Sequence, residues 1–211
     1  MLTVSEIFFS IQGESTYAGR PCVFIRLAGC NLDCSYCDTR YARSGGEKME
    51  REEVLRRVEE YGCRLAEITG GEPLLQPETL ILAEELIDRG FEVLVETNGS
   101  LPVKELDPRA VRILDIKTPG SGQSDQMDWD NLEYLTPRDQ IKFVLTSRKD
   151  YRWARGVIAE KLASNREILL APAFGTIDPA ELARWILEDG LQVRLQLQLQ
   201  KIIWPDQERG V

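Results

Sequence analysis

Short apolar stretches alternate with longer amphipathic stretches along most of this chain. The short stretches are rich in β-branched and aromatic residues, which is typical of strands. We expect strands at residues 5–12, 21–29, 65–69, 91–97, 111–117, 141–146 and 167–172. The longer stretches place apolar residues three or four positions apart, as along one face of a helix. They predict helices at residues 50–62 and 77–90, from Ser147 onward, and at 178–190.

The last regular pattern, at residues 192–200, has a period of two. In it Val193, Leu195, Leu197 and Leu199 alternate with one arginine and three glutamines. Strict alternation is the period of a half-buried strand, because successive side chains of a strand point to opposite faces. The pattern therefore predicts a closing strand at this end of the chain.

Strands that alternate with helices form βαβ units and a mostly parallel sheet. A closed eight-unit barrel usually takes about 250 residues, whereas this chain has 211 residues and fewer predicted helices than strands. We therefore expect an α/β fold, an open partial (β/α) barrel, formed by a single domain over residues 1–211. In such folds the functional residues gather at the carboxyl ends of the strands.

Charge and hydropathy narrow the classes of partner. The formal net charge is −9, which is a poor basis for binding nucleic acid. No apolar run is long enough to span a bilayer. The opening stretch, MLTVSEIFFS, lacks the basic start and the cleavage site of a signal peptide. We expect a cytoplasmic protein that binds neither nucleic acid nor a membrane.

Three of the five cysteines lie in one short loop, "CNLDCSYC", directly after the second predicted strand, and the chain has no histidine. Close thiolates such as those of Cys30, Cys34 and Cys37 bind soft metal ions. A structural zinc site requires four ligands, and Cys22 and Cys63 do not lie at a paired spacing. A 4Fe–4S cluster held by three cysteines leaves one iron open to a further ligand. The loop therefore favours such a cluster over structural zinc.

Three further motifs lie at predicted strand ends. In "TGGEP", residues 69–73, the glycines let a ligand approach the backbone and Glu72 can bind an ammonium group; the alternative is a plain β-turn before a helix. Glu96 in "ETNG" can hydrogen-bond a ribose, or it belongs to an ordinary Asn-Gly turn. Lys117 in "DIK" can contact an adenosyl group, or it only pairs with Asp115.

The C-x3-C-x2-C loop followed by "GGEP" resembles the signature of the radical S-adenosylmethionine superfamily, in which S-adenosylmethionine is the further ligand of the open iron. The stretches "EIFFSIQGES", "GRPCVFIRLAGCNLDCSYCDT", "TGGEPLLQ", "VETNGSLPV" and "RLQLQLQKIIW" resemble the 7-carboxy-7-deazaguanine synthases of queuosine and deazapurine biosynthesis, along nearly the whole chain. The resemblance implies a lyase that converts 6-carboxy-5,6,7,8-tetrahydropterin to 7-carboxy-7-deazaguanine with loss of ammonia, through a 5′-deoxyadenosyl radical.

The resemblance also implies roles for individual residues. Cys30, Cys34 and Cys37 hold the 4Fe–4S cluster, and Thr39 holds Mg²⁺. The residues implied at the S-adenosylmethionine site are Tyr36, Cys37, Asp38, Gly71, Glu72, Glu96, Asp115, Ile116 and Lys117. The residues implied at the pterin site are Ile11, Gln12, Gly13, Glu14, Arg26 and Thr69. No side chain is expected to act as an acid or base catalyst, because the cluster and S-adenosylmethionine carry the chemistry.

Arg26 suits the pterin site on physical grounds as well. Its guanidinium offers a two-pronged match to the carboxylate of the substrate. Its neighbours Ile25 and Leu27 point to the opposite face of the predicted strand. We therefore expect Arg26 to face a polar interior.

One residue departs from the pattern of the family, and two stretches are assigned less specifically. The family often has a histidine before the lysine of the last motif, and Gln200 stands there, so a group that titrates near neutral pH is replaced by an amide. Residues 171–175, "APAFG", are expected to line the pterin pocket. The polar stretch 120–134 is a lid, a partner surface or a solvated loop.

The resemblance further implies a flavodoxin or ferredoxin as the reductant and a homodimer as the assembly. Other functions remain open from the residues alone. A glycyl-radical activating enzyme shares the cysteine loop but acts on a protein and has no use for "IQGE". An iron–sulfur electron carrier normally uses four cysteines. Such a carrier also needs no cosubstrate pocket. A zinc-stabilised binding module is a further alternative.

Overall fold

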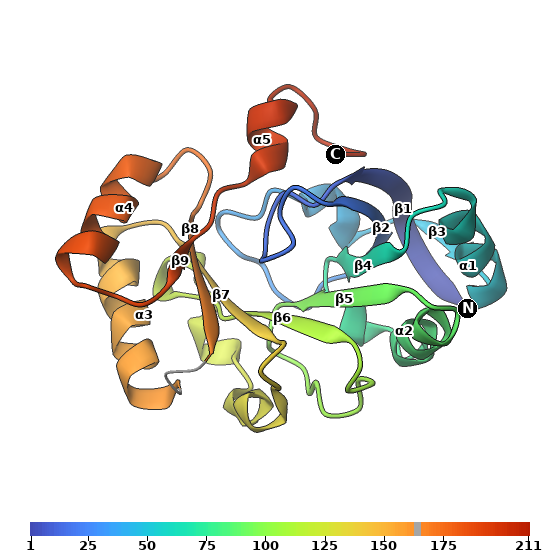
Figure 1. The fold of residues 1–211 in the computed structure, drawn as a ribbon, viewed down its shortest axis with the longest axis horizontal. Helices are drawn as coiled ribbons and strands as arrows, with labels where there is room; N and C mark the ends of the chain where they lie inside the picture. The colour runs from blue at the N-terminus through green and yellow to red at the C-terminus, as the bar shows by residue number, and fades with distance from the viewer. Residues whose placement is uncertain (163–165) are drawn as a thin grey trace.

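The computed structural model describes residues 1–162 and 166–211, and its strands form one curved sheet (Figure 1). The order of the strands is β3-β1-β2-β4-β5-β6-β7-β8-β9. Their bounds are β1 Leu2–Ile11, β2 Pro21–Leu27, β3 Glu47–Met49, β4 Leu65–Gly70, β5 Glu92–Thr97, β6 Val111–Asp115, β7 Gln140–Leu145, β8 Glu167–Pro172 and β9 Arg194–Leu195. Within the described residues β3 and β9 are the two edges, so the sheet is not closed. The expected open partial barrel is confirmed.

Of the described strands only β1 runs opposite to the others. β1 pairs antiparallel with β2 and with β3. Each pair from β2 and β4 to β8 and β9 is parallel. The sheet is therefore mostly parallel, and the carboxyl ends of β2 and of β4 to β9 lie at one rim of the partial barrel.

Helices α1 to α4 cover the outer face of the sheet, and α5 lies over the rim of the partial barrel (Figure 1). Their bounds are α1 Arg51–Glu60, α2 Glu78–Asp88, α3 Arg148–Lys161, α4 Pro179–Glu188 and α5 Leu199–Ile203. The first four are the helices expected from the periodicity, and α1 buries Val54, Leu55 and Val58 as its apolar spacing requires. No helix among the described residues is both long and apolar enough to cross a bilayer.

The prediction of a closing strand over 192–200 is wrong beyond Leu195. β9 has only Arg194 and Leu195, and α5 follows it. The chain leaves the sheet because it bonds instead to the loop between β1 and β2, where the backbone N–H of Leu199 donates to the carbonyl of Gly13 at 3.1 Å. β3, which pairs with β1, was not expected, since three residues with two charges carry no strand pattern.

The inner face of the sheet changes from apolar to polar along the strands. One core cluster consists of Phe8, Cys22, Phe24, Leu65, Leu94, Val111 and Ile113, with Tyr17 and Cys63 packed against it. Phe8 and Phe24 stack there with ring centroids 4.9 Å apart. Two residues further along β4, β5 and β6 on the same face come Glu67, Glu96 and Asp115. The partial barrel therefore has an apolar floor, and its polar side chains point into the space above that floor.

Candidate active site

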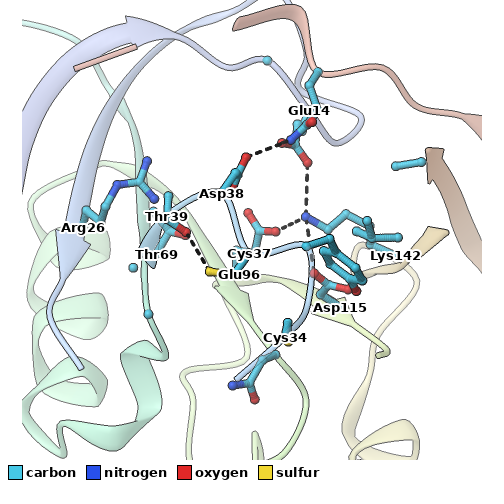
Figure 2. A pocket seen from close by; sticks show the side chains of 18 of the residues that line it. Glu14, Arg26, Cys34, Cys37, Asp38, Thr39, Thr69, Glu96, Asp115 and Lys142 are labelled. Atoms are coloured by element: carbon cyan, nitrogen blue, oxygen red, sulfur yellow. Dashed lines mark hydrogen bonds and ion pairs between the residues drawn. The ribbon is translucent and has the colours of Figure 1, made fainter. Parts of the chain in front are cut away.

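A cavity opens at the carboxyl rim of the partial barrel (Figure 2). It is lined by residues from the cysteine loop, from the loop between β1 and β2, and from the ends of β4 to β8. The predicted site residues among its lining are Ile11, Gln12, Gly13, Glu14, Arg26, Cys30, Cys34, Tyr36, Cys37, Asp38, Thr39, Thr69, Gly71, Glu96, Asp115 and Lys117. Segments far apart in the sequence thus meet in one site.

The three cysteines of the loop are free thiols on this lining. The Nδ2 atom of Asn98 lies 3.9 Å from the Sγ atom of Cys30, and the Oγ1 atom of Thr39 lies 3.9 Å from the Sγ atom of Cys37. Burial raises the pKa of the Cys34 thiol, as it does for any thiol taken out of water. A metal centre that binds the thiolate offsets this cost.

The donor set of this loop suits an iron–sulfur cluster. In residues 1–162 and 166–211, no three Cys, His, Asp or Glu side chains form a group around a single metal ion. A zinc ion needs such a group, whereas a 4Fe–4S cluster takes one thiolate on each of several irons. The three thiols, with polar and charged side chains beside them in the same cavity, fit a cluster with an open iron.

The two glycines of "TGGEP" let the end of β4 lie close to the backbone at the end of β2 and the start of the cysteine loop, and their approach to a ligand stays a prediction. A Cβ atom at Gly70 would lie 2.2 Å from the carbonyl oxygen of Leu27, and Gly70 has φ +148°. A Cβ atom at Gly71 would lie 2.0 Å from the carbonyl oxygen of Gly29. Both positions therefore require glycine, because the end of β4 lies directly beside the backbone of residues 27–29.

Two of the predicted residues, Glu72 and Ile116, are not part of the lining. The carboxylate of Glu72 is fully buried and accepts hydrogen bonds from the backbone of Leu74, the hydroxyl of Thr97 and the backbone of Asn98. The side chain of Ile116 lies in the core. Glu72 thus ties the end of β4 to the end of β5, and its contact with a ligand stays a prediction.

The centre of the cavity is a cluster of charged side chains (Figure 2). Lys117 pairs with Asp115 at 2.7 Å, the pairing that we kept open for it, and still lies on the lining. Burial disfavours the charged form of Lys117, but attraction to Asp115 outweighs it and raises the pKa of Lys117. Lys142 pairs with Glu14 at 3.1 Å and with Glu96. Both lysines are therefore held as cations.

Glu14 lies between this cluster and the last segment of the chain. Its carboxylate accepts hydrogen bonds from the amides of Gln196, Gln198 and Gln200, at 2.9, 3.1 and 3.0 Å. Burial alone would raise the pKa of Glu14, but Lys142 and the bonds from Gln198 and Gln200 lower it. Glu14 is therefore held as a carboxylate, and Gln200 donates to it where a histidine would stand in much of the family.

Arg26 faces the cavity, as the strand alternation predicts. Its Nε atom donates to Glu6 at 2.8 Å, and the hydroxyl of Tyr41 donates to the same oxygen at 2.7 Å. Gln12 is held on both sides, since its Oε1 atom accepts from the backbone of Glu14 at 2.8 Å and its Nε2 atom donates to Glu67. These bonds fix the orientation of both predicted pterin-binding side chains.

Several buried polar atoms on the lining have no hydrogen-bond partner in the described structure. They are Tyr36 Oη, Asp115 Oδ1 and Gln200 Oε1. Buried polar atoms are nearly always hydrogen-bonded in folded proteins. A polar ligand in the cavity would supply the missing partners, and two of the three residues belong to the predicted S-adenosylmethionine site.

The sequence did not lead us to three charged residues of the cavity, Arg43 in the cysteine-loop region and the strand residues Lys142 and Glu67. Lys142 and Glu67 were nevertheless within reach of the sequence. Each lies in the middle of a strand whose flanking residues are apolar, at positions 141 and 143 and at 66 and 68. A charged residue in an otherwise buried strand is costly unless it is paired. A charged residue within an apolar strand therefore indicates a paired, inward-facing side chain, and this pattern could have identified both residues.

Residues 171–175 and residues 120–134 have different roles in the structure. Ala171, Pro172, Ala173 and Phe174 of residues 171–175 line the cavity, whereas Gly175 does not. That this part of the cavity takes the pterin stays a prediction. The stretch 120–134 forms short 3₁₀ turns and packs on the core through Met127 and Asn131, which are both buried. The Oδ1 atom of Asn131 accepts from the backbone of Val103 at 2.9 Å. This stretch is therefore not simply a solvated loop.

The fold and the three-cysteine loop define the class of this protein, the radical SAM superfamily, whose family model matches residues 24–116. The chain is 46% identical to the 7-carboxy-7-deazaguanine synthase of Chlorobaculum tepidum, over 100% of this chain and 97% of that protein. It is 42% identical to the one of Koribacter versatilis, over the whole of both chains. The crystal structure of QueE from Escherichia coli matches with a TM-score of 0.75 and 25% identity, over 93% of each chain. The chain belongs to the 7-carboxy-7-deazaguanine synthase family.

Proposed function

We propose that this protein is a radical S-adenosylmethionine lyase that forms 7-carboxy-7-deazaguanine from 6-carboxy-5,6,7,8-tetrahydropterin with loss of ammonia. The observation that carries the proposal is the single cavity. It brings together in one lining the cysteine loop, the predicted pterin residues and all of the predicted S-adenosylmethionine residues except Glu72 and Ile116. The chain also belongs to the family that bears this name. When bound, the cluster and S-adenosylmethionine supply the radical chemistry, while the protein supplies orientation, charge and exclusion of water.

The cosubstrate side of the cavity lies at the ends of β5 and β6. We assign Cys30, Cys34 and Cys37 as ligands of the cluster. Tyr36 Oη and Asp115 Oδ1, which are buried and lack partners in the described structure, are placed to bind polar groups of S-adenosylmethionine. The ionised Lys117 beside them balances the charge of Asp115.

The pterin side lies between the loop after β1 and the strand β2. The amide of Gln12 and the carboxylate of Glu14 match the donors and acceptors of a pterin edge, and both are held in fixed orientations. Glu6 accepts from the Nε atom of Arg26. The two terminal nitrogens of Arg26 then face the substrate carboxylate, for which their fork is the matching shape.

We assign Thr39 as the Mg²⁺ ligand. Its hydroxyl lies 3.9 Å from the Sγ atom of Cys37, on the same cavity as the other predicted residues. Mg²⁺ prefers hard oxygen ligands and keeps several waters, so a single hydroxyl leaves positions for oxygens of the substrate.

Replacing Thr39 by alanine tests this assignment. We expect Thr39→Ala to lose most of the stimulation of turnover by Mg²⁺, because the substitution removes the proposed oxygen ligand. Thr39→Ser, which keeps the hydroxyl, should retain it. Rates measured across a Mg²⁺ titration separate the two variants. Equal stimulation of Thr39→Ala and the unchanged protein would refute the assignment.

We further propose that the chain works as one domain in a cytoplasmic homodimer, that a flavodoxin or ferredoxin reduces it, and that its product enters queuosine or a related deazapurine. These features rest on membership of the family alone.

Turnover after anaerobic reconstitution tests the main proposal. We expect iron and sulfide to be taken up, and the carboxytetrahydropterin to be converted with S-adenosylmethionine and a chemical reductant. Bound zinc without an iron–sulfur spectrum would refute the enzyme. Cleavage of S-adenosylmethionine without conversion of the pterin would favour a glycyl-radical activating enzyme instead.

A further inference from the structure

Lys142 is the one residue of the charged cluster whose ammonium contacts both predicted ligand sites in the described structure. It lies in the middle of β7, is buried, and lines the cavity. Its Nζ atom is 3.1 Å from Glu14, on the pterin side. The same atom pairs with Glu96 and lies 3.7 Å from Asp115, both on the cosubstrate side. Figure 2 shows these three contacts converging on one nitrogen.

The groups around Lys142 come from four different elements. Glu14 comes from the loop between β1 and β2, Glu67 from β4, Glu96 from β5, and Asp115 from β6, with Lys117 two residues further on. Carboxylates therefore outnumber lysines in this cluster. Burial disfavours the charged form of a lysine, but attraction to Glu14, Glu96 and Asp115 outweighs burial, so the pKa of Lys142 is well above its ordinary value.

Removing the cation would leave buried carboxylates facing one another. Neighbouring carboxylates repel one another strongly where water is excluded. A buried charge that loses its partner also lowers the stability of the folded protein. Glu14 and Glu96 would then move apart or take up protons. Either change alters the shape and the charge that a ligand meets on both sides of the cavity.

We propose that Lys142 is a positioning residue shared by the two ligand sites, holding Glu14 for the pterin and Glu96 for S-adenosylmethionine with the same ammonium group. The inference rests on the proposed function, since it adopts the two ligands named there. Lys142 acts through the two carboxylates. Its loss therefore weakens both ligands, although the pterin site and the cosubstrate site lie on different strands.

Binding without turnover tests the proposal. In the anaerobically reconstituted protein without reductant, calorimetry gives the Kd of the carboxytetrahydropterin. Titration of S-adenosylmethionine against the spectrum of the cluster gives its Kd. We expect Lys142→Met to raise both Kd values about tenfold or more, in line with the cost of removing one partner from a buried charge pair. Lys142→Arg keeps the charge and is expected to stay within about threefold of the unchanged protein for both ligands.

Controls separate positioning from a general loss of structure. Lys149→Met removes an exposed lysine at the start of α3 and should change neither Kd. Thermal unfolding of each variant shows whether it is folded. Should Lys142→Met be unfolded, Lys142→Gln carries the same expectation, since it removes the charge but keeps hydrogen-bonding capacity.

The outcomes test the shared role of Lys142 separately from the proposed enzyme activity. An effect of Lys142→Met on only one ligand, or on neither, overturns the shared role. An equal loss in Lys142→Arg would show that the shape of the lysine matters and not its charge, and also overturns it. Failure of the unchanged protein to bind the pterin counts against the proposed function instead.

Discussion

Glu67 has an unusual environment for a single carboxyl group. It is 2% exposed, sits below the charged cluster on β4, and accepts a hydrogen bond from Gln12. Burial, and then repulsion from Glu96 and Glu14, raise the pKa of Glu67 well above its ordinary value. The group is therefore a neutral acid over a range of pH in which an unfolded chain would ionise it.

This environment predicts how stability changes with pH. Above about pH 4.3 the unfolded chain releases the proton of Glu67 while the folded protein keeps it, so stability falls as pH rises toward the folded pKa. Glu67→Gln removes this loss. We expect the variant to gain stability relative to the unchanged protein by up to about 1.4 kcal/mol per pH unit. Urea unfolding from about pH 5 to about pH 8 measures it.

The exposed Glu105 offers a matched control. Glu105→Gln removes a carboxyl of the same kind without burial, so its stability should follow that of the unchanged protein at every pH. A constant difference between Glu67→Gln and the unchanged protein across the pH range would contradict the raised pKa.

The cysteines give a second prediction at this scale. Cys34→Ala should abolish uptake of a complete cluster, because only two protein ligands remain. Cys63→Ala serves as the matched control, since Cys63 is half-buried and packs against the apolar floor outside the cavity. Iron and sulfide analysis after reconstitution should give near-zero content for Cys34→Ala and unchanged content for Cys63→Ala. A full cluster in Cys34→Ala would remove it from the ligand set.

Between elements, the buried pair of Arg112 and Asp139 joins β6 to the turn before β7. Asp139 accepts from the backbone of Arg112 at 2.7 Å and from the backbone of Thr136 at 2.6 Å, and its second oxygen lies 3.4 Å from the guanidinium. The guanidinium also donates to the carbonyl of Leu106 at 2.8 Å. The pair thus fixes the connection that brings Asp115 and Lys142 to the same rim.

Removing one partner should be costly for stability. We expect Asp139→Ala to lower the free energy of unfolding by about 3–5 kcal/mol, because it leaves a buried guanidinium unpaired. Glu53→Ala breaks ion pairs with Arg56 and Arg57 on the surface of α1 and should cost at most about 1 kcal/mol. Urea denaturation compares the two, and equal losses would contradict the role of burial.

For the molecule as a whole, the open side of the partial barrel is closed by side chains rather than by strand pairing. Gln196 accepts from the backbone of Ser15 at 2.7 Å and donates to Glu14 at 2.9 Å. Gln140 accepts from the backbone of Thr16 at 2.9 Å. The loop after β1 therefore joins the β1–β2 side of the sheet to β7 and to the segment after β9, and this loop carries the predicted pterin-binding residues.

Gln196→Leu tests this closure. It leaves the buried N–H of Ser15 unsatisfied, and we expect a loss of about 1–3 kcal/mol in the free energy of unfolding. Hydrogen exchange should become faster in residues 12–20 and 194–203 and stay unchanged in β4 to β6. Gln192→Leu, at an exposed position, is the control and should change neither. Unchanged exchange in residues 12–20 would show that the closure does not depend on Gln196.

Local patterns determined much of this architecture. The short apolar stretches became β1, β2 and β4 to β8, and the amphipathic ones became α1 to α4, because alternation and helical spacing act between neighbouring residues. The alternation over 192–200 misled us for the same reason. Its glutamines bond to Glu14, 182 to 186 positions earlier, and no local pattern contains such a partner.

By itself, the sequence determined the class of fold, the three-cysteine loop and the motifs at the strand ends, since each depends on residues close together in the chain. Only the tertiary structure decided that Lys142 reaches both Glu14 and Glu96, that burial and nearby carboxylates raise the pKa of Glu67, and that Glu72 is buried outside the lining of the cavity. Charges and hydrogen bonds act through space, and the strands that carry these groups become neighbours only when the sheet forms.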